Sequence, residues 1–177
     1  FPNPEDAVSM DLAFALAKKI NADIVLANDP DADRLAVSVR TAGEFQKLTG
    51  DQVGLLLAID LLEHGEWGSD PLVATTVVSS SQLQDIAKHY QASYVETLTG
   101  FKWIANQAID HDQKGGQFVV GFEEALGYSV SSVARDKDGV SAALLIADLA
   151  SWAKSQGQTL IDLLHSLYLR FGLALSQ

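Results

Sequence analysis

The chain has 177 residues, of which 47% are hydrophobic and 20% are charged, and its 12 Lys and Arg residues against 23 Asp and Glu residues give a formal net charge of -11. This hydrophobicity excludes a natively disordered chain, which combines low hydrophobicity with high net charge. The negative charge argues against nucleic acids and anionic membranes as partners, because both are bound through Lys and Arg. No apolar run reaches the roughly 18 residues of a transmembrane helix. The absence of cysteine excludes disulfides and thiolate metal sites and fits a cytoplasmic location.

The first part of the chain predicts one helix followed by two strands. Pro4 opens the predicted helix, because proline is favoured in the first turn. The apolar residues of this helix recur at every fourth position: Val8, Leu12, Leu16 and Ile20. Residues 23–28 form a short apolar run without alternation, which is typical of a strand buried on both faces, and a second strand is expected at residues 35–40, followed by a turn at 41–44. The sequence begins at Phe1 rather than at Met, so we expect a fragment of a longer protein.

Farther along, predicted helices and strands alternate. The helices are expected at residues 49–64, 82–90, 101–111, 140–155 and 160–171. The strands are expected at residues 72–78, 93–98 and 117–122. This alternation indicates a layered α/β fold. We place a domain boundary near residues 41–48, so that residues 1–45 would end one domain and residues 46–177 would form the next.

An acidic loop directly after the first predicted strand carries the sharpest chemical signal. Asp29, Asp31 and Asp33 occupy alternate positions in the sequence Asn-Asp-Pro-Asp-Ala-Asp-Arg. Three carboxylates so close together repel one another, and a divalent cation turns this repulsion into attraction. Hard oxygen ligands suit Mg²⁺, Ca²⁺ or Mn²⁺. Ligands of open α/β sheets bind just beyond the carboxyl ends of the strands, which is where this loop would lie.

The acidic loop admits interpretations other than a catalytic metal loop. It could be a solvated acidic turn in which Arg34 neutralises one neighbour. An EF-hand is excluded, because its sixth position requires Gly and its twelfth requires Glu, whereas counting from Asp29 gives Arg34 and Arg40. A phosphatase of the haloacid-dehalogenase type, with Asp29 as nucleophile, and a non-enzymatic metal-binding module both stay open.

Four segments resemble the α-D-phosphohexomutases. Residues 28–34 resemble the metal-binding loop of that family, residues 97–103 its Thr-Gly-aromatic-Lys segment, residues 121–128 its sugar-recognition loop, and residues 136–143 the segment that follows. The order and the approximate spacing agree over essentially the whole chain. The resemblance is closest to the phosphoglucomutase and phosphopentomutase branch, in which Phe-Pro-Asn-Pro, as at residues 1–4, also occurs.

This resemblance implies α/β/α mixed-sheet domains of the phosphohexomutase type. Residues 1–45 would be the C-terminal part of domain II, which carries the metal loop, and residues 46–177 would be domain III, which carries the sugar-recognition loop. The implied parent enzyme is a phosphosugar mutase. It would move a phosphoryl group between C1 and C6, or C5, of an aldose phosphate by way of an enzyme phosphoserine, Mg²⁺ and a sugar bisphosphate intermediate. The implied partners are the sugar phosphates and the other domains of the same chain.

The resemblance also assigns roles to individual residues. It makes Asp29, Asp31 and Asp33 the Mg²⁺ ligands. Arg34 and Lys102 would be catalytic, through contacts with phosphate or in proton transfer. Glu123, Glu124 and Lys102 would bind the substrate.

One departure bears on the substrate. Many relatives carry Ser where Ala125 stands, so hexose specificity is not carried over. We expect the fragment alone to lack mutase activity, because it contains neither the family's catalytic-serine motif nor its fourth-domain phosphate loop.

Three further expectations concern residues near these motifs. Trp103 is expected in the core. The serines at positions 79–81 are expected to cap the helix that follows them, and Asp136 and Asp138 are expected to cap the helix near residue 140.

Overall fold

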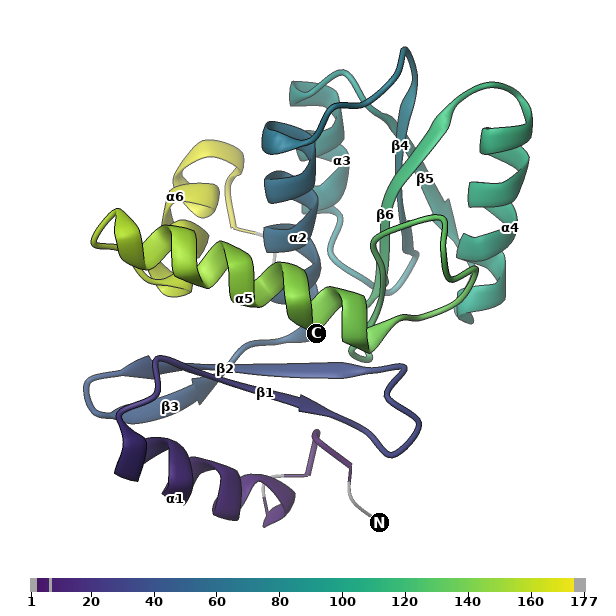
Figure 1. Cartoon of the computed structure of the whole chain (residues 1–177). Helices are drawn as coiled ribbons and strands as arrows, with labels where there is room; N and C mark the ends of the chain where they lie inside the picture. Colours follow the sequence, from purple (N-terminus) through teal and green to yellow (C-terminus); the bar gives the residue numbers. More distant parts are fainter. Residues whose placement is uncertain (1–2, 7, 174–177) are drawn as a thin grey trace.

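The structure is a computed structural model that describes residues 3–6 and 8–173. The first two residues of the Phe-Pro-Asn-Pro motif, Phe1 and Pro2, lie outside the described residues. A short 3₁₀ helix, Val8–Met10, leads into α1 (Asp11–Ile20), so the regular helix begins later than Pro4. Strands β1 (Ile24–Asn28), β2 (Leu35–Thr41) and β3 (Glu44–Lys47) form an antiparallel sheet in the order β1-β2-β3, with α1 against it (Figure 1).

The second sheet has four strands and is covered by helices on both faces. Its strands are β4 (Pro71–Thr76), β5 (Ser93–Thr97), β6 (Gln117–Glu123) and β7 (Gly127–Ser129), in the order β5-β4-β6-β7. Strand β4 is parallel to β5 and β6, and β7 is antiparallel to β6. The helices are α2 (Gly50–His64), α3 (Gln82–His89), α4 (Phe101–Gln113), α5 (Gly139–Ser155) and α6 (Leu160–Phe171). Helix α4 covers one face and α2 and α3 cover the other, which confirms the layered α/β/α fold with a mixed sheet (Figure 1).

Local sequence signals explain several helix boundaries. Thr49 and Gln52 form a capping box at the start of α2, and Thr159 and Asp162 form one at the start of α6. Each box satisfies backbone N–H groups that have no partner within the helix. These caps place both helices within one or two residues of their predicted starts.

Two short strands escaped the prediction. Strand β3 completes a hairpin whose turn contains Ala42 and Gly43, both with positive φ, as tight hairpin turns require. The predicted turn at residues 41–44 is therefore confirmed, but its second strand was missed. Strand β7 has three residues and is held by pairing with β6, which a local pattern cannot signal.

The burial of the first part differs from the prediction. The apolar face of α1 is exposed, since Val8, Leu12, Leu16 and Ile20 are all 57% to 86% accessible. The helix instead turns Ala17 and Phe14 inward, and the Phe14 ring stacks on Phe45 with centroids 5.7 Å apart. Strand β1 is half-buried rather than buried on both faces, because among the described residues it pairs with β2 alone.

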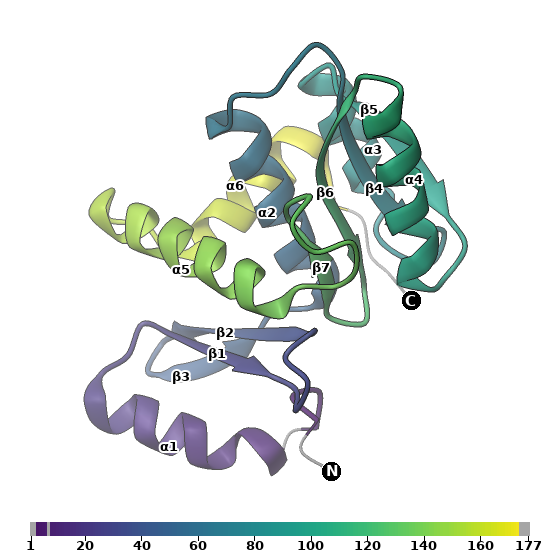
Figure 2. The same cartoon turned by 45° about the vertical axis from the view of Figure 1, so that its right-hand side comes forward.

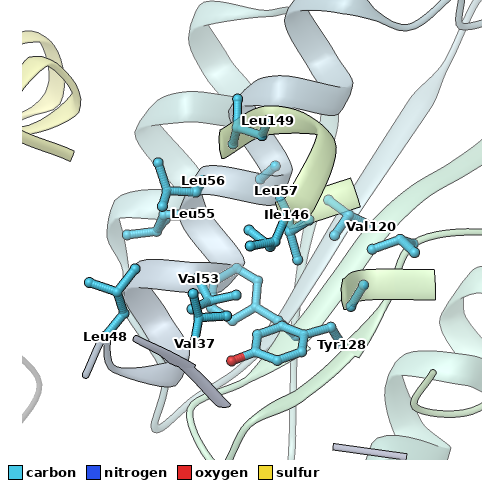
Figure 3. Close-up of a cluster of buried hydrophobic side chains, with 14 of the residues drawn as sticks. Val37, Leu48, Val53, Leu55, Leu56, Leu57, Val120, Tyr128, Ile146 and Leu149 are labelled. Carbon is cyan, nitrogen blue, oxygen red and sulfur yellow. The ribbon is translucent and has the colours of Figure 1, made fainter. Parts of the chain in front are cut away.

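A single hydrophobic cluster joins the two sheets. Leu35, Val37 and Val39 of β2 lie in the same buried cluster as Val53 of α2 and Ile146 of α5, and β2 contacts α5 directly. Figure 3 shows Val37 beside Val53 and Tyr128 in this cluster. The predicted domain boundary therefore runs through a continuous core. No described helix is both long enough and apolar enough to cross a membrane.

Candidate functional site

The acidic loop is the connection between the antiparallel strands β1 and β2. The Asn28 side chain donates to the Arg34 carbonyl at 2.8 Å, and the backbone of Ala32 adopts a positive φ of 59° with its N–H donating to the Asp29 carbonyl at 3.0 Å. This turn places one oxygen of each of Asp29, Asp31 and Asp33 within 4.8 Å of the others. Within the described residues, no other group of three His, Cys, Asp or Glu side chains converges in this way.

Asp29 is the most enclosed of the three carboxylates. It is only 6% exposed, and it accepts hydrogen bonds from the Arg34 backbone N–H (Oδ1, 3.0 Å) and from Arg34 Nε (Oδ2, 2.9 Å). Burial raises the pKa of Asp29, but the hydrogen bonds and charge of Arg34, together with the contact with Asp33, outweigh burial and hold the pKa below its ordinary value. Asp29 therefore stays ionised at neutral pH, and Arg34 is oriented by it.

Asp29 is fixed in position by its neighbour. Each of its two oxygens accepts one hydrogen bond from Arg34 and keeps a further lone pair. The salt bridge expected of a solvated turn is present between Arg34 and Asp29, and Arg34 Nε also lies 4.0 Å from Asp33 Oδ1.

A second cation, Lys137, reaches the loop from a segment for which the sequence predicts only helix caps. The Lys137 ammonium lies 2.9 Å from Asp33 Oδ2 and 3.4 Å from Asp136 Oδ1, and 5.6 Å from the centroid of the Phe101 ring. Burial lowers the pKa of Lys137, but the hydrogen bonds and the charges of Asp33 and Asp136 together outweigh burial and raise the pKa above its ordinary value, so the group is cationic. The only sequence signal was its place within residues 136–143, one of the four segments of the resemblance.

The donor set fits a hard divalent cation. The three ionised carboxylates carry a total charge of −3. Arg34 and Lys137 contribute a charge of +2, so the cluster keeps a net negative charge. Mg²⁺ prefers such oxygen ligands and is usually bound by few protein carboxylates together with water or substrate oxygens. Asp29, Asp31 and Asp33 are the residues that could hold it.

Loops at the carboxyl ends of β4, β5 and β6 form the second part of the site. Glu123 Oε1 accepts a hydrogen bond from the Gly100 N–H at 2.7 Å, which ties the end of β6 to the start of α4. Glu124 Oε2 accepts one from the Ser79 hydroxyl at 2.9 Å, which ties the same turn to the end of β4. Lys102 lies in the first turn of α4 and is exposed, with its ammonium 5.2 Å from the centroid of the Trp103 ring. The structure thus brings the predicted substrate-binding residues to one edge of the sheet.

Backbone contacts join this edge to the acidic loop. The Leu35 N–H donates to the Leu126 carbonyl at 3.1 Å, and Arg34 and Gly127 form an antiparallel bridge. Figure 2 shows the β1–β2 turn beside the turn that links β6 to β7. A Cβ on Gly139, at the start of α5, would lie 2.5 Å from the Arg34 carbonyl oxygen, so α5 also packs closely on the loop.

The predictions for Trp103 and for the caps of α5 and α3 are confirmed only in part. Trp103 is 43% exposed, so the prediction of a core position is wrong: the buried positions of this turn are Phe101 and Ile104. Asp138 caps α5 through Val140 and Ser141, as predicted, whereas Asp136 accepts from the Lys137 N–H and does not cap the helix. The cap predicted for α3 is partial. Ser81 is the N-cap residue but makes no side-chain cap, and the Ser80 hydroxyl accepts from the Gln82 N–H at 3.3 Å.

Comparisons with known proteins bear on this site. The chain is 45% identical over 174 residues to a Haemophilus influenzae protein named "Probable phosphomannomutase", and 41% identical over 181 residues to mouse phosphopentomutase. Each alignment covers 97% of this chain but only 34% and 29% of the relative, so the chain spans about a third of the length of these curated relatives.

Solved structures share the fold. A phosphoglucomutase/phosphomannomutase family protein from Burkholderia thailandensis superposes with a TM-score of 0.71 at 18% identity, covering 94% of this chain and 33% of that one. An Aspergillus fumigatus N-acetylphosphoglucosamine mutase, solved in complex with GlcNAc-6P and magnesium, superposes with a TM-score of 0.52 at 19% identity, covering 75% of this chain and 35% of that one.

Two family profiles match consecutive parts of the chain. The profile of phosphoglucomutase/phosphomannomutase, alpha/beta/alpha domain II, matches residues 1–43, and that of alpha/beta/alpha domain III matches residues 49–171. Because these matches cover almost all of its sequence in family order, the chain belongs to the phosphoglucomutase/phosphomannomutase family.

Proposed function

We propose that this chain carries the metal-binding loop and the sugar-recognition loop of a phosphosugar mutase. The parent enzyme would move a phosphoryl group between C1 and C6, or C5, of an aldose phosphate by way of an enzyme phosphoserine. The observation that carries this proposal is the convergence of Asp29, Asp31 and Asp33 beside the 123–127 turn, to which the acidic loop is joined through backbone contacts. The names of the relatives, phosphomannomutase and phosphopentomutase, support the class of reaction.

The acidic loop would hold Mg²⁺ through its three aspartates. When bound, the ion would supply positive charge to neutralise a transferring phosphoryl group, a reaction in which catalysis is mostly positioning and charge stabilisation. Arg34 donates Nε to Asp29, and its Nη1 lies 3.9 Å from Glu5 Oε2, so a phosphate oxygen would have to share the Nη groups with Glu5. The magnesium complex of the Aspergillus fumigatus fold neighbour supports the choice of metal.

The strand-end loops would bind the sugar phosphate. Glu123 and Glu124 are anchored to Gly100 and Ser79, and carboxylates held in this way can accept hydrogen bonds from sugar hydroxyls. Lys102 lies at the positive end of α4, where a phosphate is favoured by both charge and backbone N–H groups. Bidentate contacts and fixed charges would then orient the substrate between the two loops.

On its own, this chain would bind but not turn over its ligand. We propose that residues 1–45 end domain II and residues 46–177 form domain III, which the consecutive family matches support. The phosphoserine and the second phosphate-binding loop would lie elsewhere in the parent chain, together with the sites that hold the bisphosphate intermediate. We place the parent enzyme in the cytoplasm, since the chain has no cysteine.

Calorimetry tests the metal and sugar sites in sequence. The chain is titrated with MgCl₂ and then with glucose 1-phosphate, beside the variants Asp31→Asn and Asp110→Asn. Asp31 is exposed, so its replacement should leave the fold intact, and we expect it to weaken Mg²⁺ binding about tenfold or more, because a ligand charge is lost. Asp110 is an exposed aspartate of α4, outside the convergent group, and serves as the matched control with unchanged affinity.

The same samples distinguish a mutase site from a phosphatase and from a metal-binding module. Equal Mg²⁺ affinity in the wild-type chain and Asp31→Asn would contradict the metal site. In ³¹P spectra, the loaded chain should convert glucose 1-phosphate neither to glucose 6-phosphate nor to inorganic phosphate. Release of inorganic phosphate would instead indicate a phosphatase, and binding of Mg²⁺ without any sugar-phosphate heat would favour a plain metal-binding module.

A further inference from the structure

Lys137 occupies a position between the two loops of the proposed site. Its ammonium is 2.9 Å from Asp33 Oδ2, and its side chain is only 23% exposed. Its stem passes so close to Gly127 that a Cβ there would lie 2.6 Å from the Lys137 Cδ. The same side chain therefore touches the acidic loop at its tip and the 123–127 turn along its length.

The backbone that carries Lys137 is firmly held. The Asp138 N–H donates to the Tyr128 carbonyl at 2.7 Å, and the Asp138 carboxylate caps α5. Any movement of the ammonium must therefore come from rotation of its flexible side chain rather than from the loop. Lysine suits this, because its compact charge sits on a stem of four carbons that rotates freely.

The two cations of the acidic loop are bound differently. Arg34 is committed to Asp29 by two hydrogen bonds, one from the backbone and one from Nε. Lys137 holds Asp33 by one contact at the same time as it approaches Asp136 at 3.4 Å. Of the two, Lys137 is thus the cation that can leave the loop at lower cost.

A divalent cation and Lys137 compete for the same carboxylate. A metal ion held by the three aspartates would draw on Asp33, and its double positive charge would repel an ammonium only one hydrogen bond away. A ligand that must first displace a competitor binds with an apparent affinity reduced by the fraction of competent sites. The Lys137–Asp33 contact should accordingly weaken metal binding while it protects the fold from the mutual repulsion of the acids.

We propose that Lys137 is an internal counter-cation of the acidic loop that a divalent metal ion displaces from Asp33, so that the freed ammonium becomes available to an anionic ligand at the 123–127 turn. This inference rests on the proposed metal site. Binding of the metal ion would thus move the positive charge of Lys137 away from the aspartates and toward the 123–127 turn, where the sugar phosphate is proposed to bind.

Metal affinity gives the first test. Calorimetric titration with MgCl₂ compares the wild-type chain with Lys137→Met and Lys137→Gln, and we expect both variants to bind Mg²⁺ about threefold to tenfold more tightly, because a competing salt bridge of moderate strength has been removed. Arg135→Met is the matched control. It removes a positive charge from the same segment, but Arg135 pairs with Asp112 at 2.8 Å rather than with the acidic loop, so its effect should stay below about twofold.

Chemical footprinting gives a second test that needs no variant at Lys137. The wild-type chain is treated with the acetyl ester of N-hydroxysuccinimide, with and without MgCl₂, and acetylation is measured at each lysine by mass spectrometry. Acetylation of Lys137 should become about threefold faster with the metal, because a free amine reacts faster than one held in an ion pair. Lys114, an exposed lysine at the end of α4, should react at the same rate in both, and Asp31→Asn should abolish the increase at Lys137.

The outcomes separate this inference from the metal site itself. If the wild-type chain binds Mg²⁺ but both Lys137 variants bind it equally or more weakly, or if Lys137 acetylation does not change with the metal, the displacement is overturned and the metal site stands. If the wild-type chain and Asp31→Asn show the same absence of Mg²⁺ binding, both are overturned.

Discussion

The hydrogen bonds and pKa values of two carboxylates, Asp29 and Asp138, are determined by groups close to them in the sequence. Asp29 is bound by Arg34, and Asp138 by Val140 and Ser141. In Asp138, burial raises the pKa, but hydrogen bonds from Ser141 and Val140 outweigh it and hold the pKa below its ordinary value. A carboxylate whose pKa is lower in the folded state stabilises the fold above its unfolded pKa, and this stability is lost as the pH falls through the folded pKa.

Replacement of Asp138 separates its role as a cap from its charge. We expect Asp138→Ala to lower the free energy of unfolding at pH 7 by about 1 kcal/mol, the ordinary cost of a lost N-cap. Asp138→Asn keeps an amide oxygen that can cap the helix and should retain most of this stability. Urea denaturation at a series of pH values is the measurement.

The measurements at acid pH test whether the charge of Asp138 stabilises or destabilises the fold. The advantage of wild type over Asp138→Asn should be largest near neutral pH and should shrink as the pH falls below about 4, where the unfolded aspartate takes up its proton. An advantage that grows toward acid pH would show that the charge of Asp138 is unfavourable in the fold.

Among the elements, α1 shows how a helix can form with its apolar face unpartnered. The four-residue spacing of Val8, Leu12, Leu16 and Ile20 correctly indicated a helix, yet among the described residues nothing covers that face. The contact with the sheet comes from the opposite side, where Phe14 stacks on Phe45. The spacing of apolar residues predicts that a helix has a face, but not which neighbour is present to bury it.

Two substitutions on α1 should therefore have unequal effects. Leu16→Ala should change the free energy of unfolding by less than about 0.5 kcal/mol, as for a surface position. Phe14→Ala should cost about 2 kcal/mol, because it removes partly buried aromatic area. Urea denaturation of the two variants measures both values, and a larger loss for Leu16→Ala would mean that its face is covered in solution.

At the scale of the whole molecule, one core spans both sheets. Val37 of β2 lies in the same buried cluster as Val53 of α2 and Ile146 of α5 (Figure 3). Outside this cluster, Lys154 of α5 pairs with Asp23 beside β1 at 2.7 Å. Parts that share a core in this way should unfold together rather than as independent units.

Val37→Ala tests this cooperativity. We expect it to cost about 2 kcal/mol, because it leaves a cavity in the shared core. Tryptophan fluorescence, which reports on α2 to α6, and hydrogen exchange in β1 and β2 should show a single transition that shifts by the same amount. Val133→Ala is the matched control without effect, since Val133 is 91% exposed. Two transitions, with only one of them shifted, would mean that the parts unfold separately.

Short patterns in the chain account for most of the elements and for the acidic loop. The capping residue Thr49, the apolar run at residues 117–122 and the alternating aspartates of the loop each act within a few residues, so their consequences can be predicted locally. The convergence of Asp29, Asp31 and Asp33 is of the same kind, because one tight turn brings them together.

The remaining features depend on contacts between residues far apart in the chain. Lys137 reaches Asp33 across more than a hundred residues, β7 exists because β6 pairs with it, and Trp103 is exposed because its helix turns Phe101 and Ile104 inward. Such outcomes follow from how whole elements pack against each other, because the burial of apolar area and the pairing of charges depend on neighbours that a local pattern does not contain. The amino-acid order was therefore sufficient to predict that three carboxylates converge in the acidic loop. The residues that contact the loop from elsewhere, such as Lys137, were decided by the packing of the elements around it.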